Sequence, residues 1–487
     1  MRLHSLHSFM ASDFVRQTET EAREPADNQG HADRRIIMLL ILIGIIMFVL
    51  DGNVVSIALP TITRYFNTDV TLAQWVITSY LLAQTSLLMV FGKLSEYTGK
   101  IRLFLAGFAI FTLASLACGL STNLEMLILF RVVQAIGAAM AFSISAALIF
   151  EIYPISEQGK AMGYIGTAVS LGSIAGPMIG GYLVSYFGWQ YIFLINLPIG
   201  VVLLVLASKY MKIEESRSDK LEVDWVGAFT MVLFVVSLMM LLDELAKGVS
   251  PYSAAWLLIS IVSLAAFTIN ESRAKAPLLD LSVLKIKKFV LPNITVALFV
   301  ISVFTVFILG PFYFQGVMGY TPAQVGTIFL IVPLIMSIGS PIGGWIYDKY
   351  HYKYNSAFGM IIVAISLAII GYSSRKFELN YIFLAFGLLG IGNALFQSPI
   401  NTEIMNALPR SKLGTASSLS SALRNLAMAI GVSASGVLLT LQLSQAGYSG
   451  PVLDAGPHLL STTISNVIIA SAAVCLLGTV AALLRNI

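Results

Sequence analysis

The stretch Leu50-Asp51-Gly52-Asn53-Val54-Val55-Ser56-Ile57-Ala58-Leu59-Pro60 closes an apolar run that begins at Ile36. A run of this length predicts a helix that crosses a membrane, with Asp51 inside it. A charge at that position costs roughly 2.5 to 10 kcal/mol, so the carboxylate needs a charged partner or a water-filled cavity. Asp51 therefore either neutralises a buried arginine or caps an irregularity at Gly52, or it marks a transport pathway.

The composition excludes a soluble protein. Hydrophobic residues make up 57% of the chain and charged residues 11%, whereas soluble domains carry about 25% charged residues. A net charge of +4 in such a chain does not indicate nucleic-acid binding. The two cysteines, Cys118 and Cys475, lie in apolar runs and form neither a metal-binding spacing nor a disulfide framework, so we expect no metal and no cofactor.

Apolar runs separated by charges, glycine or proline predict fourteen membrane helices. Residues 1–35, which precede the helices, are polar and predict a disordered cytoplasmic tail. The helices are expected at 36–60, 71–91, 101–121, 124–153, 159–186, 189–210, 224–245, 252–271, 289–315, 322–347, 355–374, 379–408, 413–442 and 458–484.

The distribution of Lys and Arg predicts the orientation. If the N-terminus is cytoplasmic, the cytoplasmic segments contain 20 of the 29 basic residues and the outer segments four. Cytoplasmic loops carry such an excess, so we expect both termini inside a multi-pass protein of the cell membrane.

The chain contains an internal repeat with an offset of 252 residues. Gly92 and Glu96 in the turn after the second helix match Gly344 and Asp348 in the turn after the tenth. This duplication predicts an all-α fold of two six-helix bundles with an inserted helix pair. The expected bundles are 36–210 and 289–487, and the linkers and inserted pair occupy 211–288.

Five motifs in order resemble those of the major facilitator superfamily, in its fourteen-helix drug:proton antiporter branch. The loop motif comprises Gly92, Glu96, Gly99, Lys100 and Arg102, and Glu96 stands where the family usually has Asp. The other four lie at Asp51–Pro60, Arg131–Gly137, Gly172–Gly181 and Trp189–Pro198. The resemblance implies alternating access, with the loop motifs and the Gly172–Gly181 segment as gating elements.

Asp51 and Arg131 are expected to form a pair. Arg131 lies about 10 Å and Asp51 about 14 Å from the outer ends of their helices, at 1.5 Å per residue. Pairing lowers the cost of both buried charges. The pair is either a permanent salt bridge or a switch in which protonation of Asp51 releases Arg131. The resemblance favours the switch, because the arginine of the fourth helix is tied to proton coupling in that family.

Gly172, Gly176 and Gly180 recur every fourth residue and predict close helix packing, and Pro177 removes one backbone hydrogen bond. In the family this motif is typical of antiporters. Arg424 lies deep in the thirteenth helix, and its partner is expected to be Glu403 or an anionic group of the substrate. Amide and aromatic residues predict a cavity for amphipathic molecules, although ordinary helix packing explains any single one of them better. These candidate cavity residues are Asn53, Gln74, Trp75, Tyr80, Gln84, Gln134, Tyr313, Asn393, Gln397 and Arg424.

The sequence therefore predicts a proton-coupled antiporter that exports amphipathic small molecules as a monomer. It predicts neither an enzyme nor an ATP-driven pump. No nucleotide-binding loop and no nucleophile–base or metal spacing appears. Two alternatives stay open: an exporter of one lipid-like, peptide or anionic solute on the same fold, and a membrane sensor that does not transport.

Overall fold

The computed structural model describes residues 31–153, 155–211, 224–247, 250–274, 281–350, 354–408 and 413–484. Nearly all of these residues are helical, and none forms a strand. Thirteen segments are long and apolar enough to cross a membrane. The 24-residue helix α4, Trp75–Thr98, is one further long helix and stands where the second membrane helix was predicted.

The helices match the predicted positions closely. Three predicted helices contain a one-residue irregularity that separates two labelled elements: α3 from α4, α8 from α9, and α13 from α14. The elements are α2 (His31–Tyr65), α3 (Val70–Ala73), α4, α5 (Lys100–Gly119), α6 (Leu124–Ile152), α7 (Ile155–Tyr186), α8 (Tyr191–Leu194), α9 (Asn196–Tyr210), α10 (Trp225–Lys247), α11 (Pro251–Arg273), η1 (Leu281–Lys285), α12 (Lys287–Phe312), η2 (Tyr313–Val317), α13 (Pro322–Phe329), α14 (Ile331–Tyr350), α15 (Asn355–Lys376), α16 (Leu379–Asn406), α17 (Leu413–Gln445), η4 (Val452–Asp454) and α18 (Pro457–Leu484).

One helix boundary differs in a way that matters. Helix α2 was expected to end at Pro60 but continues to Tyr65. A proline inside a helix removes one hydrogen bond without necessarily ending the helix, because the neighbouring turns still pair. Asp51 therefore lies about 21 Å from the end of α2, deeper than the 14 Å expected from the sequence.

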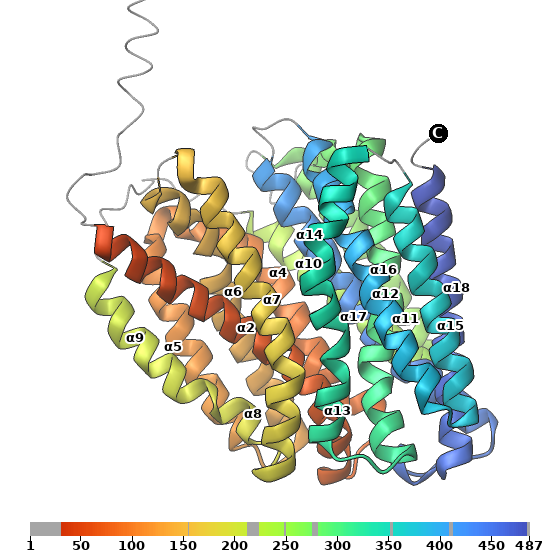
Figure 1. The fold of residues 1–487 in the computed structure, drawn as a ribbon. Coiled ribbons are helices and arrows are strands. Elements are labelled where there is room, and N and C mark those ends of the chain that lie inside the picture. Colours follow the sequence, from red (N-terminus) through yellow and green to blue (C-terminus); the bar gives the residue numbers. More distant parts are fainter. Residues whose placement is uncertain are drawn as a thin grey trace, which may run out of the picture.

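The helices form two bundles with an inserted pair (Figure 1). In the first bundle α2 packs on α7, and α6 packs on both α4 and α5. In the second, α15 packs on α16 and α18, and α12 on α17. The inserted helices α10 and α11 pack on each other, and α10 also contacts α4 and α17 at the junction of the bundles. The bundle limits proposed from the sequence stay predictions. Of the expected tail 1–35, residues 1–30 lie outside the described residues, and residues 31–35 belong to α2.

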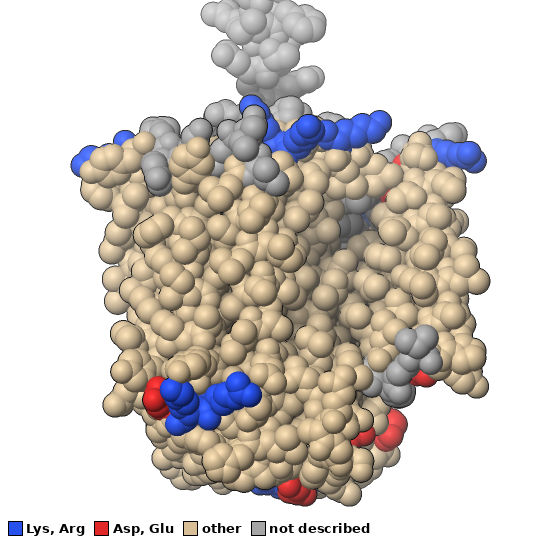
Figure 2. All heavy atoms as spheres, turned by 90° about the vertical axis from the view of Figure 1, so that its right-hand side faces the viewer, with Lys and Arg blue, Asp and Glu red and all other residues tan. Residues whose placement is uncertain are grey.

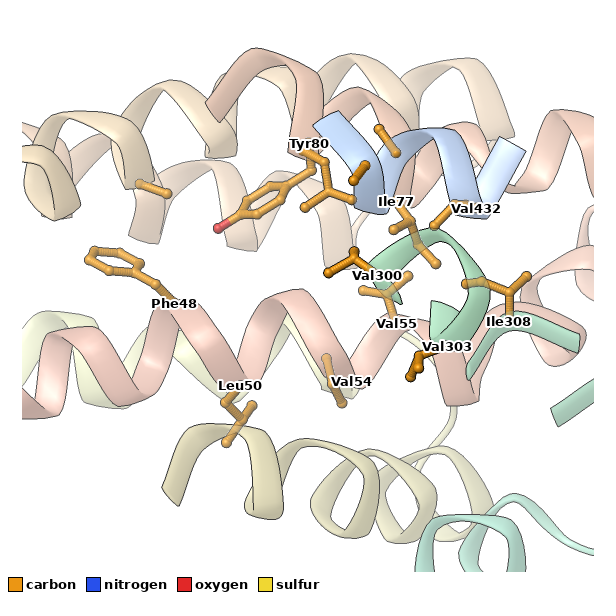
Figure 3. Packing of buried hydrophobic residues seen from close by; sticks show 14 of the residues in the cluster. Phe48, Leu50, Val54, Val55, Ile77, Tyr80, Val300, Val303, Ile308 and Val432 are labelled. Carbon is orange, nitrogen blue, oxygen red and sulfur yellow. The ribbon is translucent and has the colours of Figure 1, made fainter. Parts of the chain in front are cut away.

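An apolar layer joins the two bundles near their centre. Figure 3 shows Val55 of α2 and Ile77 of α4 close to Val300 and Val303 of α12 and Val432 of α17. All five side chains are buried. Because these residues come from both halves of the chain, the layer holds the two bundles together.

Polar contacts close the junction on one side of that layer. The Gln315 amide donates to the Ile57 carbonyl (3.0 Å), and the Ala323 backbone N–H donates to the Ser185 hydroxyl (2.9 Å). The hydroxyls of Thr71 and Thr440 lie 3.1 Å apart. These residues lie toward the end of the molecule where α2 finishes. Figure 2 shows Lys and Arg gathered mainly at the opposite end, where the surface is also hollowed.

Candidate functional site

Asp51 lies at the centre of a fully buried hydrogen-bonded cluster in the first bundle. Its Oδ2 accepts a hydrogen bond from Arg131 Nη1 at 2.6 Å. Its Oδ1 accepts from Gln134 Nε2 at 3.0 Å and from Asn196 Nδ2 at 2.9 Å. Asp51, Arg131, Gln134 and Asn196 are all 0% exposed. The structure thus brings together the two charges that the sequence pairs, and it adds two amides.

Arg131 is held from several directions. Its Nε donates to the Val76 carbonyl (3.0 Å), and Nη1 also donates to Gln134 Oε1 (2.6 Å). The ring of Tyr80 lies 4.1 Å from the guanidinium carbon, and that of Phe193 lies 5.5 Å away. Cation–π contacts of this kind strengthen when both groups are shielded from water. The guanidinium is therefore fixed by α4 and α8 as well as by the carboxylate.

Ser115 and Asn196 belong to this cluster but were not identified from the sequence. The Ser115 hydroxyl accepts from both Gln134 and Asn196, at 2.5 and 3.2 Å. Asn196 lies inside the Trp189–Pro198 motif, so an amide in an apolar run was the available signal. Ser115 gave none, because serine hydroxyls commonly bond to carbonyls of their own helix.

Three side-chain donors satisfy the carboxylate of Asp51. A buried ion pair is stable only when additional hydrogen bonds fill the remaining lone pairs, and both amides serve that purpose here. Arg131 and Gln134 lie three residues apart on α6, which places them on one helix face toward Asp51. Chemically, the cluster can hold one negative charge, and protonation of Asp51 would remove the attraction that holds Arg131.

The glycine series of α7 packs directly on the helix that carries Asp51. A Cβ on Gly172 would lie 2.9 Å from the Ile46 carbonyl, and one on Gly176 would lie 2.9 Å from the Asn53 Cβ. A Cβ on Gly180 would collide with Val54. The three glycines thus follow α2 along both sides of Asp51, and Pro177 carries the carbonyl that approaches Gly326 of α13. Close packing was expected, and the structure shows its partner to be α2.

Several candidate cavity residues contact protein in this conformation. Tyr80 and Gln134 contact Arg131, and the buried Gln74 amide lies against Gly436 of α17. The buried Tyr313 hydroxyl donates to the Ser374 carbonyl at 3.2 Å. The Asn53 amide donates to its own helix at Val49. Trp75 and Gln84 are half-buried. Their role in a cavity stays a prediction.

The loop motif forms a sharp turn between α4 and α5. Gly99 has φ = +95°, a backbone conformation that residues other than glycine rarely adopt, and Lys100 begins α5. Gly92 has open space around it, and Arg102 is exposed. The side chains of Glu96 and Asp348 lie outside the described part of the chain. The gating role of this motif therefore stays a prediction.

A second polar cluster lies in the other bundle, around Arg424. Its Nη1 donates to Gln397 Oε1 at 3.0 Å, and its Nη2 donates to Asn401 Oδ1 at 3.1 Å. Gln397 in turn donates to Asn393 at 3.3 Å. Arg424 was expected to contact Glu403 or an anion. Among the described residues no carboxylate contacts it, because α16 presents two amides instead.

Comparison with known proteins identifies the family. The family model described as Major Facilitator Superfamily matches residues 41–432. The chain belongs to the Major Facilitator Superfamily. It is therefore a multi-pass membrane transporter and not an enzyme, as the sequence predicts.

Its relatives within the superfamily are diverse. The chain is 32% identical to the riboflavin transporter RibZ of Clostridioides difficile, over 81% of this chain and 86% of that protein. It is 31% identical to the multidrug resistance protein Stp of Mycobacterium tuberculosis (82% and 75%) and 30% identical to the multidrug export protein EmrB of Escherichia coli (82% and 78%).

Solved structures confirm the fold. A bacterial homologue of the lysosomal transporter Spinster superposes with a TM-score of 0.66 at 14% identity, covering 94% of this chain and 97% of that one. A POT family transporter superposes with a TM-score of 0.67 at 15% identity, covering 95% and 97%.

Proposed function

We propose that this transporter exports amphipathic small molecules from the cytoplasm in exchange for protons, by alternating access. The observation that carries the proposal is the buried Asp51 carboxylate, whose charge is balanced by Arg131 and held by Gln134 and Asn196. A titratable group in the membrane interior that couples to an arginine on another helix is typical of proton relays in transporters. The multidrug relatives support export of amphipathic molecules.

The proposed orientation places both termini in the cytoplasm of a cell with the protein in its plasma membrane. Lys and Arg gather at the end where α2 begins, which supports this choice (Figure 2). The bundles are joined by hydrogen bonds at the opposite end. In this orientation the structure is closed toward the outside, and the transporter acts as a monomer.

The coupling follows from the contacts of Asp51. While the carboxylate is charged, it holds α2 to α6 through Arg131 and to α9 through Asn196. Protonation from the outer side would weaken both contacts, so the bundles could move and exchange substrate. Since α7 is packed on α2 along Gly172, Gly176 and Gly180, a movement of α2 would be transmitted to α7 and to its contacts with α13.

A proton-release measurement tests the proposal. Inverted membrane vesicles with an acidic interior are exposed to ethidium while the internal pH is recorded. The wild-type protein should release protons, and Asp51→Asn should not, although it still binds ethidium. The exposed Asp454→Asn is the matched control and should behave as wild type. Proton release by Asp51→Asn at the wild-type rate would exclude Asp51 from coupling.

A second candidate function is the export of one dedicated solute. It is favoured by Arg424, which contacts amides and no carboxylate among the described residues, and by the similarity to a riboflavin transporter. No proton release from either protein on addition of ethidium, but release on addition of an anionic amphiphile, would support this candidate.

A further inference from the structure

Arg424 lies well away from the closed end of the bundle junction. The segment formed by α3 and α4 runs antiparallel to α17. Thr71 of α3 meets Thr440, and Gln74, which follows α3, meets Gly436, which precedes Thr440 on α17. Arg424 is twelve residues before Gly436 on α17, which places it about 18 Å toward the Lys- and Arg-rich end. It therefore lies beyond the contacts that close the junction.

The two amides hold the guanidinium in a fixed orientation. Gln397 and Asn401 are four residues apart on α16, so they lie on one face of that helix. Each accepts one hydrogen bond, from a different terminal nitrogen of Arg424. Gln397 is itself bonded to the buried Asn393. The arginine is thus oriented before any ligand arrives.

The charge of Arg424 is not neutralised by the described residues. Amide oxygens accept hydrogen bonds but carry no net charge, and a guanidinium has five N–H groups. Arg131 shows the contrast, since a carboxylate lies 2.6 Å from its Nη1. A cation inside a membrane protein is costly unless an anion or water reaches it.

The side chains of this cluster are partly exposed. Arg424 and Gln397 are half-buried, and Asn401 and its neighbour Thr402 are exposed. The cluster of the first bundle differs in this respect, since every member of it is fully buried. The cluster around Arg424 is therefore partly exposed in the conformation that encloses Asp51.

We propose that Arg424, Gln397 and Asn401 form a subsite for an oxyanion, a carboxylate or phosphate group attached to an apolar body. A planar guanidinium with free N–H groups binds such groups through two parallel hydrogen bonds. This inference rests on the proposed export function, and it adds that anionic amphiphiles are one class of substrate.

The test compares two ligands that differ in one group, fluorescein and fluorescein methyl ester, in which the carboxylate is blocked. Fluorescence polarisation measures their affinity for the full-length protein in phosphatidylcholine nanodiscs without a proton gradient. The wild-type protein should bind fluorescein about tenfold more tightly than the ester, because only the acid forms charge-assisted hydrogen bonds. Arg424→Gln should abolish this preference, and Arg424→Lys should retain part of it because lysine is a point charge.

The exposed Arg375→Gln is the control and should keep the full preference. Equal or absent binding of the two ligands by wild type, or an unchanged preference in Arg424→Gln, would overturn the subsite. Repeating the measurement with phosphatidylglycerol identifies the source of the oxyanion. If the lipid phosphate occupies the subsite, the wild-type preference disappears; if it persists, the ligand is a dissolved solute.

The binding measurement is independent of proton coupling. Asp51→Asn should therefore keep the preference for fluorescein while losing proton release. A preference that depends on Arg424, found together with no proton release by wild type on addition of either ethidium or fluorescein, would retain the subsite and reject antiport.

Discussion

The two arginines inside the helix bundles of this transporter occupy opposite kinds of environment. Arg131 is fully buried and contacts a carboxylate, a backbone carbonyl, an amide and two aromatic rings. Arg424 is half-buried and contacts two amides. The first arrangement neutralises the charge of Arg131 away from water. The second leaves the charge of Arg424 without a countercharge among the described residues. The fold thus places a fully buried polar cluster in one bundle and a partly exposed cluster in the other.

The sharpest test of this contrast removes each guanidinium. Arg131→Gln leaves Asp51 buried without a countercharge, which should cost about 3–5 kcal/mol of stability and abolish transport. Arg424→Gln breaks no ion pair among the described residues, so its stability should stay within about 1 kcal/mol of wild type. Thermal unfolding of both purified variants in detergent provides the measurement. Equal losses would show that the two environments do not differ energetically.

Substitutions in the packing of α7 on α2 should have nearly as large an effect as the loss of Arg131. Gly176→Leu places a large side chain against Asn53 and should destabilise the protein by about 1–3 kcal/mol and reduce transport at least about tenfold. Gly166→Leu introduces the same side chain on the same helix, where no atom lies within 4 Å, and should be tolerated. Transport rates and unfolding temperatures of the two variants are compared. Similar rates would mean that the close approach near Asp51 is incidental.

The asparagine of each cluster offers a smaller, matched change. Asn196→Leu removes a hydrogen bond to a buried carboxylate and should cost about 1.5–3 kcal/mol. Asn401→Leu should cost less than about 1 kcal/mol, because water can replace the lost acceptor at an exposed position. Combining Asn196→Leu with Asp51→Asn completes a double-mutant cycle. Additive effects in that cycle would contradict a direct contribution of Asn196 to the carboxylate.

The smallest effect is expected at Tyr80. Its ring covers Arg131, while its hydroxyl is buried with no hydrogen-bond partner among the described residues. Tyr80→Phe should change stability by less than about 0.5 kcal/mol, and Tyr80→Leu should cost about 0.5–2 kcal/mol through loss of the cation–π contact. Unfolding temperatures distinguish the two. A larger loss in Tyr80→Phe would assign the hydroxyl a role that the contacts do not show.

The Asp51–Arg131 pair was predictable because charges are rare in apolar helices and opposite charges at similar depth form ion pairs. From the sequence, Gln134 was predicted to line the substrate cavity. The sequence does not reveal that its side chain points to the carboxylate of Asp51. Ser115 could not be found, because hydroxyls recur in these helices. Ser237 and Ser302, for example, donate to carbonyls of their own helices.

The sequence by itself determined the membrane class, the positions of the long helices, the family and the pairing of its two most deeply buried opposite charges. These follow from hydropathy and charge, which act locally along the chain. Only the tertiary structure decided that Arg424 meets amides instead of Glu403, that Asn196 completes the Asp51 cluster, and which end of the junction is closed. Such contacts depend on how each helix is rotated and tilted against its neighbours, and packing across the whole bundle sets those angles.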